Sequence, residues 1–285
     1  MITFGKLRRS FAPAVRRLFE SCPPVRIIAV KLLTIKQKST FNRCGCHFKL
    51  PKGDFGVTFE LDSTGEYEPL TTKTIEELLK EGSVFVDVGA HVGLFSVPAT
   101  KWVGKSGCVI AFEPHPDNFA LLSENVQSNG LTEGVSIENA AVSNNNGSIK
   151  LYPSSFNTGD HQVYPTSGRR GIDIQCVSLD SYFGVGDQVD VIKMDVQGAE
   201  GAAFEGMKRV LQENQNVVVI WELSPSQLEA FGTTAETVLE FLKSLGFSST
   251  IIDDVTGSIE EVTNAELLNR CPYDSYINVL SSRRE

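Results

Sequence analysis

The stretch VFVDVGAHVGLFS, from Val84 to Ser96, decides the fold of this 285-residue chain. An apolar run carries a carboxylate, Asp87, near its end, and two glycines, Gly89 and Gly93, follow four residues apart. A short run of branched and aromatic residues bounded by turn signals is typical of a fully buried strand. The stretch therefore predicts a buried strand over 84–88 and a glycine-bearing turn into a helix.

Strand-like and helix-like segments alternate after this point. The predicted strands are 84–88, 108–112, 135–142, 189–194, 217–223, 247–252 and 275–281, with further strand-like pieces near 148–152 and 172–179. The predicted helices are 92–103, 117–129, 199–213 and 234–245. Strands that alternate with helices of about a dozen residues indicate a mostly parallel sheet with helices on both faces. We therefore predict an α/β fold with a doubly wound sheet.

The residues that directly follow the apolar runs are the candidates for function. Right-handed crossovers bring the carboxyl ends of parallel strands to one edge of a sheet, and ligands bind there, where the strand order reverses. At this edge the sequence places the loop 87–93, Glu113, Asn139, Asp195 and Glu222.

The loop after the first of these strands does not suit a diphosphate. A dinucleotide site has the pattern G-x-G-x-x-G, but His91 occupies the position of the middle glycine, and its Cβ would crowd a pyrophosphate. The carboxylate of Asp87 would also repel phosphate. S-adenosylmethionine fits better because it carries an ammonium and a sulfonium, and we predict that Asp87, Gly89, Ala90, His91 and Gly93 bind it.

Two further residues are predicted to hold the adenosine part of this cofactor. Glu113 lies 26 residues after Asp87, at the end of the next strand, and a carboxylate accepts hydrogen bonds from both ribose hydroxyls. Asn139 either pairs with the adenine edge or satisfies local backbone groups in a turn. The loop residues also have purely structural interpretations, because Gly89 and Gly93 can serve a tight turn and Asp87 can cap a helix.

Charge is unevenly distributed along the chain. The net charge is −9, yet residues 1–38 contain nine Lys/Arg and one acid, Glu20, so the remainder is strongly acidic. An acidic body argues against nucleic acid as a partner. No apolar run reaches the roughly 18 residues that span a bilayer. No secretory signal is recognisable, so we expect a cytoplasmic protein.

The first part of the chain is predicted to be separate from the sheet. Residues 1–40 form a basic helical extension, 41–82 form short strands and a helix with Thr74 as its N-cap, and 83–285 form the main domain. Residues 1–38 either lie on an anionic membrane surface or pack on the domain that follows. Cys44, Cys46 and His47 resemble half of a zinc site, but no second ligand pair accompanies them, and no metal site is predicted.

Four segments together resemble the FkbM-type family of S-adenosylmethionine-dependent methyltransferases. They are VFVDVGAHVGLFS, AFEPHPDNFALLSENV, SLDSY and VDVIKMDVQGAE. The resemblance implies a seven-stranded, Rossmann-like class I methyltransferase sheet whose last strand is antiparallel. It also implies methyl transfer to a hydroxyl group, often on a sugar, a glycolipid or a natural product. This chain departs from the family pattern at His91, where asparagine is common, and at Gln197, where glutamate is.

The predicted catalytic residues follow from strand position and from the resemblance. A hydroxyl is a weak nucleophile, so a base or a metal ion must assist it. Asp195 and Glu222 end the fourth and fifth strands of the core, and we favour Asp195 as the base or orienting group. His161 is a second candidate base, N-capping is an alternative role for Asp195, and a divalent cation near it is possible but not predicted.

Other functions stay open at this point. A non-catalytic binding protein with the same fold, an N-methyltransferase and a nucleotide-sugar or NAD enzyme are the alternatives. The acceptor, a small molecule or glycan, and the oligomeric state are not readable from the sequence.

Overall fold

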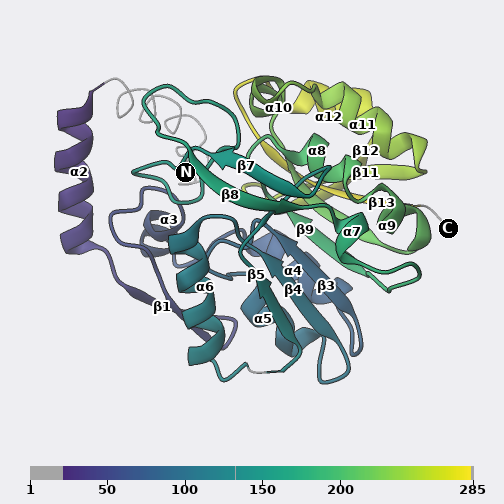
Figure 1. The fold of residues 1–285 in the computed structure, drawn as a ribbon, viewed down its shortest axis with the longest axis horizontal. Coiled ribbons are helices and arrows are strands. Elements are labelled where there is room, and N and C mark those ends of the chain that lie inside the picture. The colour runs from purple at the N-terminus through teal and green to yellow at the C-terminus, as the bar shows by residue number, and fades with distance from the viewer. Residues whose placement is uncertain (1–21, 132, 284–285) are drawn as a thin grey trace.

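The computed structural model describes residues 22–131 and 133–283 (Figure 1). The helices are α2 (Pro23–Lys36), α3 (Val57–Thr64), α4 (Pro69–Leu78), α5 (Ser96–Trp102), α6 (Pro116–Ser128), α7 (Leu179–Tyr182), α8 (Glu200–Glu205), α9 (Lys208–Glu213), α10 (Pro225–Phe231), α11 (Ala235–Ser244) and α12 (Asn264–Arg270). The strands are β1 (Thr40–Arg43), β2 (Cys46–Lys49), β3 (Val84–Val88), β4 (Cys108–Phe112), β5 (Val135–Glu138), β6 (Ala141–Val142), β7 (Gly147–Leu151), β8 (Ile172–Val177), β9 (Val191–Met194), β10 (Val218–Leu223), β11 (Phe247–Asp253), β12 (Ser258–Val262) and β13 (Ile277–Arg283).

The central sheet has eight strands in the order β12-β11-β13-β10-β9-β3-β4-β5. All pairings from β10 to β5 are parallel, and β13 is antiparallel to both of its neighbours. The doubly wound, mostly parallel sheet and the antiparallel last strand are therefore as predicted. The prediction of seven strands is wrong, because the sheet has eight. The edge strand β12 is an eighth, formed because the turn before Gly257 folds the chain back onto β11.

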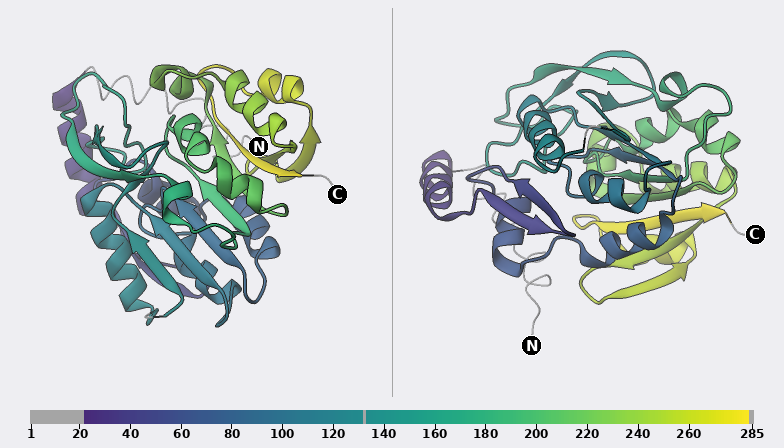
Figure 2. Two further views of the ribbon diagram at one scale, coloured as in Figure 1. Left: turned by 45° about the vertical axis from the view of Figure 1, so that its right-hand side comes forward. Right: turned by 90° about the horizontal axis from the view of Figure 1, so that it is seen from below.

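Helices cover both faces of this sheet (Figure 2). Side chains alternate along each strand, so that Phe85 faces the side covered by α4 and α5, while Val86 and Val88 face α8, α9 and α11. α6 packs beside α5 over the β4 end of the sheet. The central strands are buried on both faces, which explains their nearly continuous apolar sequence.

The predicted strand 135–142 is divided between two sheets. β5 belongs to the central sheet, whereas β6 joins a small second sheet of order β6-β8-β7. Asn139 and Ala140 lie between them. The strand-like pieces near 148–152 and 172–179 thus form β7 and β8 of the small sheet and not part of the main one.

Tertiary contacts moved several predicted helix boundaries. α4 begins at Pro69 and contains Thr74, so Thr74 is not its N-cap; the first free amides, of Leu70 and Thr71, donate instead to the carboxylate of Asp254. The sequence predicted one helix within 41–82, whereas the structure has two there, α3 and α4.

The predicted helix over 199–213 is two helices. Gly206 ends α8 where the chain passes the Ser143 carbonyl, and a Cβ on Gly206 would lie 1.9 Å from that oxygen. The carboxylate of Asp180 then accepts from the amides of Arg209 and Val210, which open α9. The SLDSY segment therefore has a structural role: its aspartate caps a helix elsewhere in the chain.

Part of the basic extension can be placed. Residues 1–21 of the predicted basic helical extension lie outside the described residues, and α2 follows them, standing at one edge of the molecule (Figures 1 and 2). Within 22–131 and 133–283, no helix combines the length and the apolar character that crossing a membrane requires.

The loops that follow β3 and β9 cross at Gly89. A Cβ on Gly89 would lie 2.0 Å from the backbone oxygen of Asp195, and the φ angle of Gly89 is +83°. The amide of Asp195 also donates to the Val88 carbonyl at 3.0 Å. Only glycine meets both the steric and the conformational requirement here.

We expect Gly89→Ala to reduce the free energy of unfolding by about 2–5 kcal/mol, because a left-handed backbone and an overlap with backbone atoms add together. Gly130→Ala is the matched control, since φ is +71° there but no atom lies within 4 Å of an added Cβ. It should cost only about 1–2 kcal/mol. Urea unfolding of the two variants measures the difference, and equal losses would show that the loop crossing is not constrained.

Candidate active site

A pocket opens at the carboxyl edge of the central sheet, at the predicted switch point. Its polar lining includes Tyr67, His91, Glu113, Asn118, Ser143, Thr158, His161, Lys193, Asp195 and Gln197. Its apolar lining includes Val57, Leu94, Phe95, Pro114, Ala140, Val142, Ile149, Leu151, Val163 and Phe231. The loops after β3, β4, β5 and β9 thus meet in one cavity, together with the small sheet and the segment between β7 and β8.

The glycine loop forms the floor of this pocket. The amides of Gly89 and Ala90 both donate to the Phe112 carbonyl at 2.9 Å, so the loop is fixed to the end of β4. His91 has a φ of 53°, a left-handed conformation that is unusual for residues other than glycine and asparagine. Asparagine, the residue that the family resemblance implies at this position, adopts this conformation more readily than histidine. The His91 ring Nε2 lies 2.8 Å from Thr158 Oγ1.

Glu113 lines the pocket and links the loops that follow β3 and β4. Its carboxylate accepts from the amides of His91 and His115, each at 2.8 Å, and the residue is 4% exposed. Burial raises the pKa of Glu113 to about 7, although these two amides oppose the shift. The side chain of Asn118 is a third donor to this carboxylate, and a lone pair is left with which it is able to accept a ligand hydroxyl as well.

Asp87 lies beneath the glycine loop and does not line the pocket. It is completely buried, and the Ser96 hydroxyl donates to its Oδ2 at 2.5 Å. No described residue donates to its Oδ1. Burial raises the pKa of Asp87, and the positive charge of Lys193 opposes that shift. In this geometry Asp87 supports the loop from below and does not touch the cavity. Gly93 likewise faces α6, because a Cβ there would lie 2.7 Å from Leu122.

Asn139 also lies outside the pocket lining. Its side-chain amide donates to the carbonyls of Glu113 at 2.8 Å and of Pro114 at 3.2 Å. Asn139 thus connects the ends of β4 and β5, which agrees with the alternative that it satisfies local backbone groups. Its neighbour Ala140 lines the cavity.

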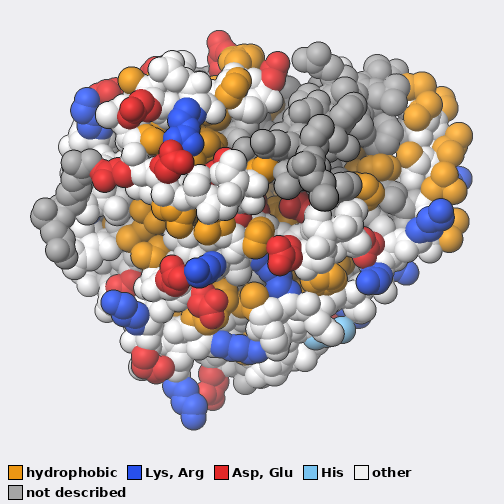
Figure 3. Space-filling model, turned by 180° about the vertical axis from the view of Figure 1, so that it is seen from behind, with side chains coloured by type: hydrophobic (Ala, Val, Ile, Leu, Met, Phe, Trp, Pro, Cys, Tyr) orange, Lys and Arg blue, Asp and Glu red, His pale blue; other side chains and the backbone are white. Residues whose placement is uncertain are grey.

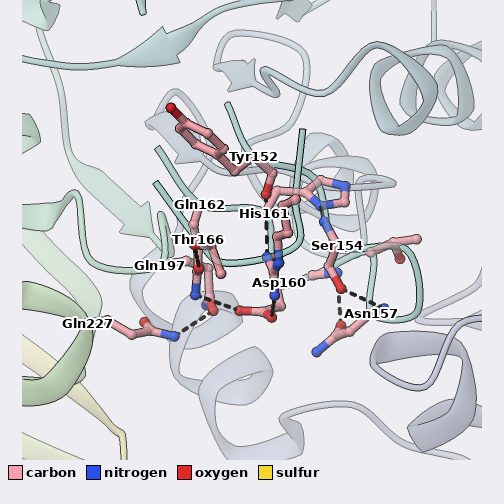
Figure 4. A network of polar contacts seen from close by, with 12 residues as sticks. Tyr152, Ser154, Asn157, Asp160, His161, Gln162, Thr166, Gln197 and Gln227 are labelled. Carbon is pink, nitrogen blue, oxygen red and sulfur yellow. Dashed lines mark hydrogen bonds and ion pairs between the residues drawn. The ribbon is translucent and has the colours of Figure 1, made fainter. Parts of the chain in front are cut away.

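Asp195 and Glu222 end neighbouring strands and are joined by Gln197. The Gln197 amide nitrogen lies 2.6 Å from Asp195 Oδ1 and 3.2 Å from Glu222 Oε1. Its oxygen accepts from Gln227 at 3.0 Å, which fixes the orientation of the amide (Figure 4). A neutral donor between two carboxylates is possible with glutamine, whereas an ionised glutamate would repel both.

The two carboxyl groups differ in their surroundings. Asp195 lines the pocket, and its side chain is 19% exposed. Glu222 is 7% exposed, and its burial, followed by the charge of Asp195, raises its pKa well above the usual value. Glu200, at the end of the VDVIKMDVQGAE segment, is buried as well and accepts from the Val196 amide, so it supports the loop.

Lys193 is a site residue to which the sequence assigned no function. Its Nζ lies 3.6 Å from Asp195 Oδ2 and 4.9 Å from the centre of the Phe95 ring. Burial would lower the pKa of Lys193, but the nearby carboxylates, first that of Asp195, outweigh burial and raise it. A lysine within an otherwise apolar strand was the available signal, because a charge survives in a core only when it is paired.

His161 reaches the pocket from the segment between β7 and β8 (Figure 4). The Ser154 amide donates to its Nδ1 at 3.1 Å, so the neutral ring carries its proton on Nε2. Burial, followed by the proximity of His115, lowers the pKa of His161 to about 2. These surroundings suit a hydrogen-bond donor and not a proton acceptor, so we do not keep His161 as a base.

The segment that carries His161 is held firmly over the pocket. Arg169 and Asp160 form a buried ion pair at 2.6 Å, with both side chains 6% exposed. The carboxylate of Asp54 accepts from the Thr158 amide at 2.8 Å and from the Thr58 amide at 2.7 Å. The region before β3 therefore fixes one wall of the pocket, a long-range contact that the sequence pattern does not reveal.

No metal cluster is present in the part of the chain that the structure describes. No three His, Cys, Asp or Glu side chains among residues 22–131 and 133–283 are arranged to hold an ion. Cys44 is exposed, Cys46 is buried, both thiols are free, and the His47 ring pairs with Asn42.

Comparison with known proteins matches residues 87–249 to the methyltransferase FkbM domain. This range contains every predicted cofactor and catalytic residue. A hexuronic acid methyltransferase, AglP, of Haloferax volcanii is 31% identical over 162 residues, covering 55% of this chain and 63% of that protein. The match therefore spans less than two thirds of that relative.

Two further comparisons are more distant. The methyltransferase sdnD of Sordaria araneosa is 27% identical over 183 residues, covering 51% of this chain and 69% of that protein. Among solved structures, an rRNA methylase from Streptococcus thermophilus is similar with a TM-score of 0.45 and 12% identity, over 76% of this chain and 95% of that one.

We expect Gln197→Glu to destabilise the protein more at pH 8 than at pH 5.5. The new carboxyl would lie between Asp195 and Glu222, so its native pKa would rise above its unfolded value, and stability would fall as the pH rises between the two. Gln188→Glu is the control, because Gln188 donates to the Asp190 carboxylate in the same way but is exposed. Urea unfolding at both pH values tests this, and a loss that does not depend on pH would contradict it.

Proposed function

Because this chain belongs to the FkbM family of methyltransferases, we propose that it transfers a methyl group from S-adenosylmethionine to a hydroxyl group of a sugar or a related polyhydroxylated acceptor. The proposal rests above all on one juxtaposition. The glycine loop and the Asp195 loop touch at Gly89, so a ligand on the first loop lies next to the carboxyl groups on the second.

The residues at one end of the pocket fit this cofactor. Glu113 presents a carboxylate to the cavity, as two adjacent ribose hydroxyls require, and Leu94, Phe95 and Pro114 supply apolar surface. The left-handed backbone conformations of Gly89 and His91 bring the loop backbone close to the ligand without a diphosphate-type pattern. His161 offers an Nε2–H donor that no described residue accepts. When bound, S-adenosylmethionine supplies a methyl group on a positively charged sulfur.

The residues at the other end fit an acceptor hydroxyl. Asp195 lies at the cavity wall, and Gln197 and Lys193 fix its two oxygens, so its carboxylate is oriented to receive the hydroxyl proton. Glu222 lies behind Gln197 and is buried, so we assign it to positioning that amide and not to proton transfer. Orientation of this kind matters because the acceptor oxygen, the methyl carbon and the sulfur must lie in line.

The acceptor class is supported by the relative in Haloferax volcanii, which is named for a hexuronic acid. A site that combines carboxyl, amide and ammonium groups suits a ligand rich in hydroxyls, because each such group pairs with an alcohol. None of the described contacts favours a nitrogen acceptor or a purely binding role over this one.

The affinity for S-adenosylmethionine should increase as the pH rises through 7. The pKa of Glu113 is about 7 in the chain without ligand, and ribose hydroxyls are best accepted by the ionised form. One linked proton changes the dissociation constant by up to about tenfold between pH 6 and pH 8. Isothermal titration across this range measures it.

Glu113→Gln provides the control, because it cannot titrate. The part of the pH dependence that the variant lacks belongs to Glu113, whereas the ligand's own amino group contributes equally to both proteins. If the two proteins show the same pH dependence, Glu113 does not hold the ligand as proposed.

We expect Asp195→Asn to retain cofactor affinity and to lower kcat by about 10²- to 10⁴-fold, the usual contribution of a positioned base. Labelled methyl transfer to a panel of monosaccharides and uronic acids measures turnover. Asp173→Asn is the control, because Asp173 is an exposed carboxylate that pairs with Lys150. Full activity of Asp195→Asn would exclude it as the base, and failure of the wild-type chain to bind the cofactor would exclude the function itself.

A further inference from the structure

The helix α2 presents an apolar stripe that the described chain does not cover. The exposed fractions are 40% for Val25, 61% for Ile28, 56% for Leu32 and 81% for Ile35. Their spacing of three, four and three residues puts all four on one side of the helix. Single exposed apolar residues are ordinary, but a stripe that runs the length of a helix needs a partner.

The other side of α2 is fixed to the body of the protein. Val30 and Thr34 lie against Gly53, so that a Cβ on Gly53 would be 3.0 and 2.6 Å from them. The side chain of Gln37, directly after the helix, accepts from the amides of Gly53 and Asp54 at 2.8 and 3.1 Å. These contacts set the rotation of α2, and the stripe therefore faces away from the pocket-bearing domain.

Positive charges border the stripe. α2 contains Arg26, Lys31 and Lys36 and no acidic residue. Lys31 lies three residues after Ile28, and Lys36 lies four after Leu32, so the two exposed lysines stand on opposite borders of the apolar side. Figure 3 shows a column of apolar side chains at the right-hand edge, over α2, with basic side chains beside it.

We propose that this stripe of α2 lies in the surface of a membrane that contains anionic lipid. Apolar side chains enter the boundary between headgroups and acyl chains, and flanking lysines meet lipid phosphates, which is the arrangement of an interfacial helix. A helix of 14 residues is about 21 Å long, too short to cross the hydrocarbon core.

A second copy of the chain is a poorer occupant than lipid. A symmetric contact between two copies of the stripe would bring the lysines of both helices together without an acidic partner on either α2. The charge of α2 thus favours an anionic surface over self-association.

Co-sedimentation of the full chain with vesicles tests this proposal. We expect retention on vesicles of phosphatidylcholine with phosphatidylglycerol, weaker retention on phosphatidylcholine alone, and a decrease with added salt. Ile28→Glu with Leu32→Glu should reduce retention at least tenfold. Val185→Glu with Ile259→Glu is the matched control, because both residues are exposed and apolar, at 85% and 48%, but lie elsewhere.

A second pair of variants separates the two contributions. Lys31→Gln with Lys36→Gln should weaken binding to the anionic vesicles and reduce its dependence on salt, while the apolar stripe is intact. Circular dichroism of each variant shows whether the fold is kept.

Three results would overturn the proposal. The first is no retention of the wild-type chain on the anionic vesicles. The second is equal retention of the wild-type chain and the Ile28→Glu with Leu32→Glu variant, which would place the binding outside the stripe. The third is a dimer in sedimentation velocity that this variant abolishes, which would make the stripe a contact between two copies.

Discussion

The contact between Gly89 and the carbonyl of Asp195 is the constraint on which the site depends. It joins the turn after β3 to the turn after β9, two strands that are neighbours in the sheet but are separated by about a hundred residues of chain. Because the contact leaves no space for a side chain, the distance between the two turns is fixed by backbone atoms. Gly198, in the loop after β9, makes a second close backbone contact of this kind, because a Cβ there would lie 2.5 Å from the Gln227 carbonyl.

Electrostatic balance is the second requirement of this site. Several carboxyl groups converge below and beside the pocket, and burial raises the pKa of Asp87, Glu200 and Glu222. Lys193 offsets part of this charge, and Gln197 separates Asp195 from Glu222 with a neutral donor. The glutamine at a position where relatives of the FkbM type commonly have glutamate is thus compatible with an ordered site.

The site residues that directly follow a strand could be predicted from the sequence. Those that reach the site only through long-range contacts could not. Gly89, Ala90, His91, Glu113 and Asp195 do line one pocket, as strand ends of a parallel sheet must share an edge. Asp87 and Asn139 have the same sequence signal but point elsewhere, because a residue number near a strand end does not fix the direction of a side chain. The segment over the pocket, held by Asp54 and Arg169, has no periodic pattern at all.

The sequence by itself determined the alternation of strands and helices, the parallel core, the glycine loop and the family. These are local properties, set by residue type and by spacing along the chain. Only the tertiary structure decided which charges are paired, that Asp254 and Asp180 cap distant helices, that Lys193 is buried against Asp195, and which side of α2 is exposed. Each of these depends on groups far apart in the chain that folding brings within a few ångströms, and such proximity leaves no signature in the spacing of residues.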